Sequence, residues 1–448
     1  MNKIIITSFH PFVSRNILSA PFYEMLKHTG WRIMLLVPER KKEFFEREYG
    51  GIGVAVEAMP NLLSRADGIF RELAMAAIRT RSLAIMRKRG MGIFHPLLQR
   101  FFFFAPLIRS LIPFLYGYFM YTSAYRALLK KYNPSVVFAT DVFSSNDCRL
   151  LLEAKRLRIP TVGMVRSWDS LTTKGGFRVI PDTLIMNNNL VKEEAMRLHG
   201  ISASRIRVVG IPHYDRYLSP PARTRAEILS ALGVPTDKRL ALYVPLGDRI
   251  VKVGERALTH TFDRDIIALI ARLLPPSHTL LVRLPPTDTV NLEELPLLKN
   301  VVFDQPGTRF GDGIGGRRIA EMTRAEDVRL HETIFATDFV LTVFSSVCID
   351  AVVMGKPVIL IGFDPVPVSY WESVSRIHEF EHIRPVLQSG GVATVRSESE
   401  LQNALISCAR KPAADTEKRR ALAEWETYAL DGKSSKRMLE VVLGALKS

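Results

Sequence analysis

The chain has 448 residues, of which 47% are hydrophobic and 24% charged, so it has room for two ordinary globular domains. Its three cysteines, Cys148, Cys348 and Cys408, are too few and too scattered for a disulfide framework or a zinc site. They indicate a reducing compartment such as the cytoplasm, and the net charge of +16 predicts an anionic partner.

The first half alternates expected strands and helices. The apolar run after Met1-Asn2-Lys3 is too short for a signal peptide and is typical of a first strand, over 3–8. A helix near 18–29 and a strand over 32–38 complete a βαβ unit, which implies a parallel sheet. Further strands are expected over 135–140, 161–165, 183–186 and 206–209. We therefore expect a doubly wound, Rossmann-like domain over 1–215.

An insert over 73–131 interrupts this pattern. Between residues 73 and 140 the sequence has no Asp or Glu but ten Lys or Arg. Basic residues near an anionic leaflet contribute on the order of 1 kcal/mol each, so we expect helices that lie on the membrane surface. The expected membrane contacts are Arg79, Arg81, Arg87, Lys88, Arg89, Phe102 and Phe103.

The aromatic run 101–121 leaves three structures open. It has the length of a membrane span, about 20 residues, but Arg109 would lie in the middle, and Pro106 and Pro113 would break the helix. An interfacial helix or helical hairpin fits better, and a buried pair of core helices is the alternative. Nucleic acid is not the expected partner, because no nucleic-acid motif accompanies the basic residues.

The second half repeats the alternation. Residues 216–238 contain Ser219-Pro220-Pro221 and Val234-Pro235, which are typical of a linker. Strands and helices then alternate again in a second Rossmann-like domain over 239–425, and a closing helix lies within 426–448. The expected elements of this half are strands over 240–245, 279–284 and 300–303, two strands within 337–362, and helices over 260–274, 417–430 and 435–446.

One segment of the second domain predicts phosphate binding. An apolar strand ends at Ser345-Ser346, a short helix follows, and Gly355-Lys356-Pro357 precedes another apolar strand. Free N–H groups and the helix dipole favour a phosphate at a strand-to-helix turn, and two hydroxyls add donors. Serine is also a common N-cap on stability grounds alone.

The same segment carries a resemblance. Phe344-Ser345-Ser346, Asp350 and Gly355-Lys356-Pro357-Val358-Ile359 resemble the nucleotide-phosphate segment of GT-B-fold transferases. The similarity is strongest to the CDP-glycerol glycerophosphotransferase family and related bacterial surface-polysaccharide glycosyltransferases. It implies two Rossmann-like domains facing a cleft, with the donor in the second domain, the acceptor in the first, and helix 426–448 returning to the first.

Donor-binding residues are expected at the strand ends of the second domain. A donor diphosphate needs fixed cations and N–H groups where charge develops. Asp350 either accepts a hydrogen bond from a donor hydroxyl or only stabilises its helix dipole, and Arg283 is alternatively an ordinary surface arginine. The family's His-Pro pair is replaced by Pro285-Pro286. The expected set is Gly247, Arg249, Arg283, Ser345, Ser346 and Asp350.

The loop 166–176 of the first domain provides the candidate base. It resembles the Trp-Asp-Asn-Leu-Thr-like loop of polysaccharide glycosyltransferases, and Asp169 stands where glycerophosphotransferases have the histidine of a Trp-His-Gly-type sequence. A carboxylate there would deprotonate an acceptor hydroxyl, unless Asp169 only forms an Asx-turn. His10 is the second candidate base, with a structural role as its alternative.

These expectations describe a cytoplasmic, metal-independent glycosyltransferase without a cofactor, on the inner face of the cell membrane. It would move a sugar from a UDP- or CDP-type donor to a lipid-linked or polysaccharide acceptor. The alternatives are polyol-phosphate transfer from a CDP-activated donor, a nucleotide-sugar epimerase, and a non-catalytic membrane scaffold.

Overall fold

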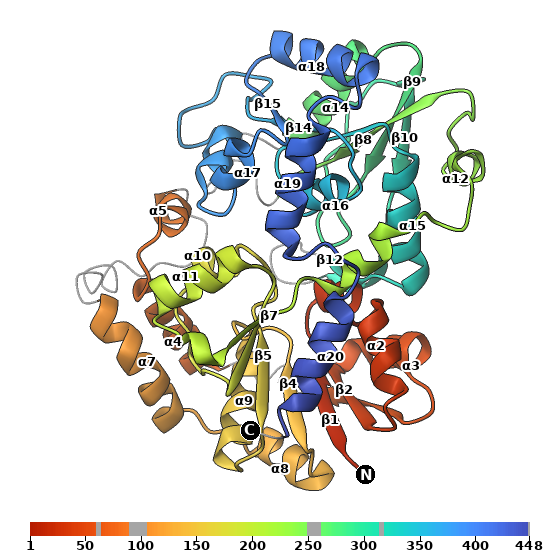
Figure 1. Cartoon of the computed structure of the whole chain (residues 1–448). Coiled ribbons are helices and arrows are strands. Elements are labelled where there is room, and N and C mark those ends of the chain that lie inside the picture. Colours follow the sequence, from red (N-terminus) through yellow and green to blue (C-terminus); the bar gives the residue numbers. More distant parts are fainter. Residues whose placement is uncertain (60–63, 89–104, 249–260, 313–317, 447–448) are drawn as a thin grey trace. The chain divides into compact units, whose positions relative to one another are not determined.

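The computed structural model describes residues 1–59, 64–88, 105–248, 261–312 and 318–446 (Figure 1). The chain forms two compact units. Unit 1 comprises Met1–Ala84, Gly92–Arg216 and Trp425–Ser448, and unit 2 comprises Ile85–Met91 and Tyr217–Glu424. Four residues that were expected in functional contacts lie outside the described residues, namely Arg89, Phe102, Phe103 and Arg249.

Unit 1 is built on a seven-stranded parallel sheet in the order β3-β2-β1-β4-β5-β6-β7. Its strands are β1 (Lys3–Thr7), β2 (Arg32–Pro38), β3 (Val54–Met59), β4 (Val136–Ala139), β5 (Thr161–Met164), β6 (Thr183–Met186) and β7 (Ile206–Val208). Its helices are α1 (Pro11–Val13), η1 (Ser14–Leu18), α2 (Pro21–Lys27), η2 (Glu39–Lys41), α3 (Lys42–Tyr49), α4 (Arg65–Ala76), α7 (Ala105–Phe119), α8 (Ser123–Tyr132), α9 (Ser145–Arg156), α10 (Ser170–Thr173), α11 (Asn189–His199), η4 (Ala203–Arg205) and α20 (Ser434–Gly444). A boundary between the units falls within each of three helices, namely α5 (Arg81–Lys88), η5 (Pro212–Leu218) and α19 (Thr416–Thr427).

Both faces of this sheet are covered, which explains why its central strands are almost wholly apolar. Ile5 and Val137 pack with residues of α8 and α9. On β4, the ring of Phe138 meets that of Phe22 of α2 edge-on, 6.2 Å away.

Unit 2 is built on a six-stranded parallel sheet in the order β10-β9-β8-β13-β14-β15. Its strands are β8 (Arg239–Val244), β9 (His278–Arg283), β10 (Val301–Asp304), β13 (Phe339–Thr342), β14 (Val358–Ile361) and β15 (Ala393–Val395), with a separate antiparallel hairpin of β11 (Thr308–Asp312) and β12 (Arg318–Glu321). Its helices are α12 (Arg225–Ala231), α14 (Phe262–Leu273), α15 (Arg324–Ala336), α16 (Val347–Val353), η7 (Val374–Glu379), α17 (Arg384–Gln388) and α18 (Glu398–Arg410).

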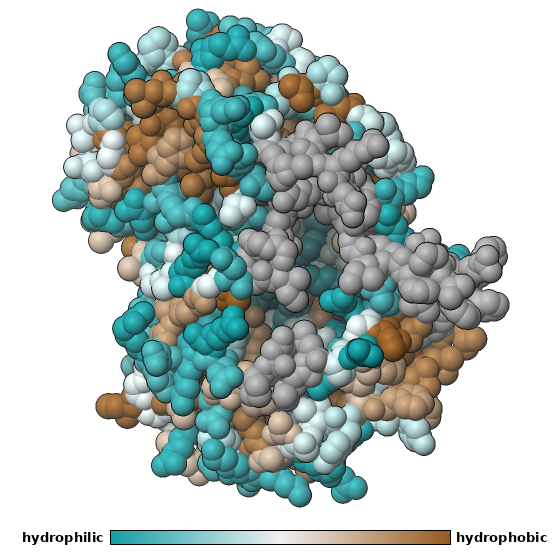
Figure 2. All heavy atoms as spheres, turned by 180° about the vertical axis from the view of Figure 1, so that it is seen from behind, coloured by the Kyte–Doolittle hydropathy of each residue, from teal (hydrophilic) through white to brown (hydrophobic). Residues whose placement is uncertain are grey.

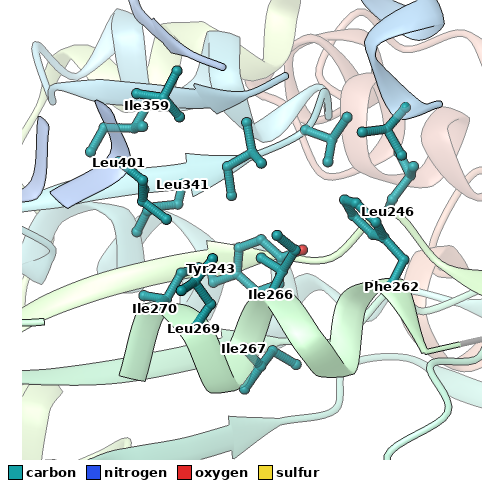
Figure 3. Packing of buried hydrophobic residues seen from close by; sticks show 14 of the residues in the cluster. Tyr243, Leu246, Phe262, Ile266, Ile267, Leu269, Ile270, Leu341, Ile359 and Leu401 are labelled. Carbon is teal, nitrogen blue, oxygen red and sulfur yellow. The ribbon is translucent and has the colours of Figure 1, made fainter. Parts of the chain in front are cut away.

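The core of unit 2 forms where α14 packs on this sheet. Ile266 and Ile270 of α14 lie against Tyr243 of β8, and Leu341 and Ile359 of the neighbouring strands belong to the same cluster (Figure 3). These side chains are fully buried. The packing fixes the strands whose ends carry the candidate donor site.

The structure differs from the sequence expectation in the region expected to be a linker, 216–238. Within the expected linker, Thr224 and Glu227 form a capping box that starts α12, and α12 packs against α15. In unit 1, α20 packs against α2 (Figure 1).

The insert is helical in its described parts. We expected Pro113 to break the helix, but α7 runs through it. Packing of α7 against α4 offsets the lost hydrogen bond and the steric clash that an internal proline brings. Within the described ranges, no helix has both the length and the apolar character needed to cross a membrane.

Candidate active site

Each sheet has one topological switch point, and polar residues gather at both. In unit 1 the strand order reverses between β1 and β4, and in unit 2 it reverses between β8 and β13. Ligands of open α/β sheets bind at such points, beyond the carboxyl ends of the strands. His10 and Asp141 follow β1 and β4, whereas Gly247 and Ser345 follow β8 and β13.

In unit 2, a buried carboxylate holds the loop after β8. Asp263 accepts hydrogen bonds from the Tyr243 hydroxyl at 2.6 Å and from the backbone N–H groups of Leu246 at 3.1 Å and Gly247 at 2.8 Å. Burial raises the pKa of Asp263. Gly247 has φ +89°, and a Cβ there would lie 2.9 Å from the Asp288 carboxylate, so only glycine fits.

The Ser345-Ser346 turn lies on the neighbouring strand end. Both serines are partly exposed. The Ser345 hydroxyl lies 3.4 Å from the Val347 N–H, a long hydrogen bond, while the Ser346 side chain makes no capping bond to α16. The N-cap alternative therefore accounts poorly for Ser346.

A histidine that the sequence reasoning missed supports this turn. His378 Nε2 lies 2.9 Å from the carbonyl oxygen of Val343, which directly follows β13 and precedes the serines. Burial lowers the pKa of His378, and a Cβ on Gly362 would lie 2.9 Å from its Nδ1. His378 is far from the turn in sequence, so no local pattern pointed to it.

Two expected donor contacts are buried in this structure. Arg283 is 4% exposed and forms an ion pair with Asp304, which also binds Arg329 at 3.1 Å. Asp350 has no exposed surface. Arg283 is therefore held inside unit 2 by its ion pair, and a direct ligand contact would require either side chain to leave its present position.

The lysine of the Gly-Lys-Pro segment also has a structural role. Its Nζ donates a hydrogen bond to the carbonyl oxygen of Phe335, near the end of α15, at 2.7 Å. Lys356 precedes β14, so it lies at the edge of the sheet opposite the serines.

In unit 1, three side chains form a chain of polar contacts at the switch point. The Arg166 guanidinium donates through Nε to Asp141 at 2.7 Å, and its Nη1 lies 3.1 Å from His10 Nδ1. Burial would raise the pKa of Asp141, but Lys174 and Arg166 hold it below its usual value. Asp141 directly follows an expected strand, a signal that the sequence reasoning did not use.

These contacts fix the tautomer of His10. Its Nδ1 also accepts a hydrogen bond from the Phe12 N–H at 3.2 Å. Neither a backbone N–H nor a guanidinium can accept a hydrogen bond, so Nδ1 is the acceptor in both contacts. A neutral His10 therefore carries its proton on Nε2, which makes Nε2 a donor and argues against His10 as the general base.

A second buried acid lies behind Asp141. Asp147 accepts a hydrogen bond from the Thr7 hydroxyl at 2.5 Å, and Thr7 also contacts the Thr140 hydroxyl at 3.1 Å. Burial, and then the charge of Asp141, raise the pKa of Asp147 to about 7. Among the described residues, its Oδ2 is buried with no hydrogen-bond partner.

Asp169 lies at the start of α10 and is partly exposed. Its Oδ2 accepts a hydrogen bond from the Thr173 hydroxyl at 3.2 Å, and its backbone oxygen accepts one from the same hydroxyl at 2.8 Å. This is a turn geometry, and it leaves the carboxylate at the surface of the loop.

The insert holds this loop in place. The Gly176 N–H donates to the carbonyl oxygen of Ala74, at the end of α4, at 2.8 Å. The Thr80 hydroxyl donates to the carbonyl oxygen of Thr172 at 2.7 Å. The loop that carries Asp169 is thus anchored to the insert by hydrogen bonds on both sides of Gly175.

The basic residues of the insert are mostly exposed where the structure describes them. Arg79, Arg81 and Lys88 are exposed, and Arg87 is partly exposed. Lys88 lies 4.5 Å from the centre of the Trp371 ring. Membrane contact through these side chains stays a prediction.

Comparison with known proteins adds a family. The family model described as CDP-glycerol:poly(glycerophosphate) glycerophosphotransferase matches residues 178–444, more than half of the chain. No curated protein matches the chain.

Solved structures share the fold over almost the whole chain. A UDP-GlcNAc 2-epimerase from Neisseria meningitidis bound to UDP-GlcNAc has a TM-score of 0.57 at 12% identity and covers 99% of this chain and 100% of its own. The epimerase from Methanocaldococcus jannaschii has a TM-score of 0.55 at 17% identity, covering 99% of both chains. A glycosyltransferase from Rickettsia africae has a TM-score of 0.52 at 11% identity and covers 100% of this chain and 99% of its own. The expected GT-B fold, with two parallel-sheet α/β domains, is confirmed.

Proposed function

Because the chain belongs to the CDP-glycerol:poly(glycerophosphate) glycerophosphotransferase family, we propose that it is a transferase that takes its group from a nucleotide-diphosphate donor. Unit 2 binds the donor and unit 1 binds the acceptor. The observation that carries this proposal is the pair of partly exposed hydroxyls at the switch point of unit 2, Ser345 and Ser346, beside the loop that Asp263 holds.

The phosphates of the donor accept hydrogen bonds from these two hydroxyls. Arg283 is paired to Asp304, so it does not contact the phosphates in this proposal. Within the described part of unit 2, the phosphate contacts come from the two serines and from the backbone of the loop after β8. Arg249 is proposed to add a cation, because it directly follows this loop in the sequence. The reaction is proposed to proceed without a metal or a cofactor.

The transferred group is first proposed to be a sugar. The acceptor hydroxyl attacks the anomeric carbon, the bond between that carbon and the phosphate oxygen breaks, and a nucleoside diphosphate leaves. Asp169 takes the hydroxyl proton, because its carboxylate is partly exposed on the acceptor unit. His10 is assigned the role of a hydrogen-bond donor through Nε2, which follows from its tautomer.

The family match favours a second candidate, glycerol-phosphate transfer, because it includes most of unit 2. In that reaction the acceptor hydroxyl attacks the β-phosphorus of CDP-glycerol, the P–O–P bond breaks and CMP leaves. The nucleotide released by the working enzyme therefore separates the two reactions. A nucleoside diphosphate indicates sugar transfer, CMP indicates glycerol-phosphate transfer, and a rearranged nucleotide sugar without an acceptor indicates an epimerase.

The acceptor is proposed to be a lipid-linked or polysaccharide hydroxyl at the cytoplasmic face of the cell membrane. The acid-free basic stretch 73–140 supports this location, since it suits an anionic surface. The three cysteines are free thiols, which suits a reducing compartment.

Thermal unfolding with UDP and CDP tests the donor site. We expect at least one of them to raise the Tm of the wild-type protein. The double variant Ser345→Ala/Ser346→Ala should bind that nucleotide about tenfold or more weakly, because two hydrogen bonds to charged oxygens are lost. Ser230→Ala, an exposed serine on α12, is the matched control. Wild-type affinity in the double variant would remove the phosphate role, and no shift with any nucleotide would favour the scaffold alternative.

A further inference from the structure

Helix α7 presents a continuous apolar stripe to solvent. Leu107, Leu111, Phe114 and Tyr118 are 59%, 43%, 71% and 75% exposed, respectively. Their spacing of four, three and four residues places them on one face of the helix. Isolated exposed apolar residues are ordinary, but four large ones in a row on one helix indicate an interaction surface.

The opposite face of α7 packs against the rest of unit 1. Ile112, Tyr116 and Met120 are buried, and the Tyr116 ring meets that of Phe70 of α4 edge-on at 5.1 Å. Arg109 is also turned toward the protein, since its Nη1 donates to the carbonyl oxygen of Leu198 at the end of α11, at 2.7 Å. The described part of the aromatic run, in α7, is therefore core on one side and exposed on the other, and its outer stripe carries no charge.

Figure 2 shows an apolar patch at the lower right, the side on which α7 lies when Figure 1 is turned by 180°. The sequence around it, residues 73–140, contains ten basic and no acidic residues. An apolar stripe within a segment that is rich in basic residues complements an anionic bilayer, where apolar groups enter the acyl boundary and cations contact the headgroups. Tyrosine and phenylalanine at the stripe suit this interfacial depth.

We propose that the outer face of α7, formed by Leu107, Leu111, Phe114 and Tyr118, docks on an anionic phospholipid bilayer. This inference rests on the proposed membrane location and identifies the surface that achieves it. It adds a described apolar surface to the expected contacts Phe102 and Phe103, which lie outside the described residues, and to the expected basic contacts of the insert.

The docking face is linked to the acceptor loop through α4. Tyr116 of α7 packs on Phe70 of α4, and the end of α4 accepts the hydrogen bond from Gly176 that holds the loop with Asp169. The helix pair α4–α7 therefore joins the proposed bilayer-contacting face to the loop. This arrangement suits an acceptor that is itself embedded in the membrane.

Sedimentation with vesicles tests the surface, using the full chain. We expect binding to vesicles of equal parts phosphatidylglycerol and phosphatidylcholine and much weaker binding to phosphatidylcholine alone. Phe114→Ser/Tyr118→Ser should weaken binding to the anionic vesicles by about tenfold or more, because two inserted aromatic rings are lost. Ile52→Ser/Met196→Ser, which alters exposed apolar residues elsewhere on unit 1, should bind as wild type does.

Three results would overturn this inference. They are equal binding of the Phe114/Tyr118 variant and the wild type, no binding of the wild type to anionic vesicles, and a dimer in analytical ultracentrifugation that only this variant dissolves. The nucleotide-induced Tm shift should be the same in the variant and the wild type. A shift missing from both would refute the proposed function and leave the docking surface standing.

Discussion

Replacing Asp263 by alanine should destabilise unit 2 by about 3 kcal/mol. The carboxylate is the acceptor for three buried donors, namely the Tyr243 hydroxyl and the N–H groups of Leu246 and Gly247. A buried donor that loses its partner costs about 1–3 kcal/mol, and relief of the buried charge, which raises the pKa of Asp263, offsets part of the sum. Because the same N–H groups shape the loop after β8, nucleotide affinity should fall as well.

Urea unfolding followed by circular dichroism measures this change, with Asp265→Ala as the control. Asp265 lies two residues along α14, is partly exposed and pairs with Arg264 at 3.0 Å, so its loss should cost less than about 1 kcal/mol. Tyr243→Phe should cost about 1 kcal/mol alone and little more in the Asp263→Ala background, since the hydrogen bond is already gone. Equal losses for Asp263→Ala and Asp265→Ala, or full additivity with Tyr243→Phe, would refute the reasoning.

Two further predictions concern unit 1. The pKa of Asp147 is raised by burial to about 7, so its contribution to stability is complete below the unfolded value and is lost as the pH rises toward 7. Relative to Asp147→Asn, the free energy of unfolding of the wild type should therefore fall by about 1.4 kcal/mol per pH unit between about pH 4 and 7. A difference between the two proteins that does not change with pH in urea titrations would contradict this. Gly175→Ala should cost about 2 kcal/mol or more in the same assay, because its φ is +83° and a Cβ would lie 2.5 Å from the Ala74 backbone. The control Gly68→Ala, in α4 with no atom within 4 Å of the new Cβ, should instead stabilise by about 0.5–1 kcal/mol, so equal effects at the two glycines would refute this.

Much of the fold could be predicted from the sequence, because the hydrophobic pattern of buried strands is local. The expected strands over 3–8, 161–165 and 279–284 correspond to β1, β5 and β9 within a residue or two. The sequence reasoning missed β3, β15 and the β11-β12 hairpin. The burial pattern of β3 is mixed, with Val54 and Ala55 outside the core, so it lacks the apolar run that marked the other strands.

The candidate site was less predictable, because its supports are long-range. The strand-to-helix pattern predicts the turn at Ser345 and Ser346, and a similar pattern predicts the loop 166–176 that contains Asp169. The partners that hold these loops could not, since His378 and Asp263 lie far along the chain from at least some of the groups they bind. Arg283 shows another limit of local patterns, because an arginine at a strand end suggests a ligand contact, whereas the structure pairs it with Asp304 of the next strand.

The two switch points use their acids in the same way. Asp263 in unit 2 and Asp141 in unit 1 are both buried near the end of a strand. The carboxylate oxygens of each accept hydrogen bonds from groups of the protein itself. Loss of either acid would therefore reduce activity by releasing a loop, and the reduction alone would imitate loss of a catalytic carboxylate. Asp169 differs, because its carboxylate is partly exposed and its substitution should leave the urea midpoint nearly unchanged while transfer is lost. Stability measured beside activity is thus what separates an acid proposed to act on a substrate, such as Asp169, from acids that hold a loop in place.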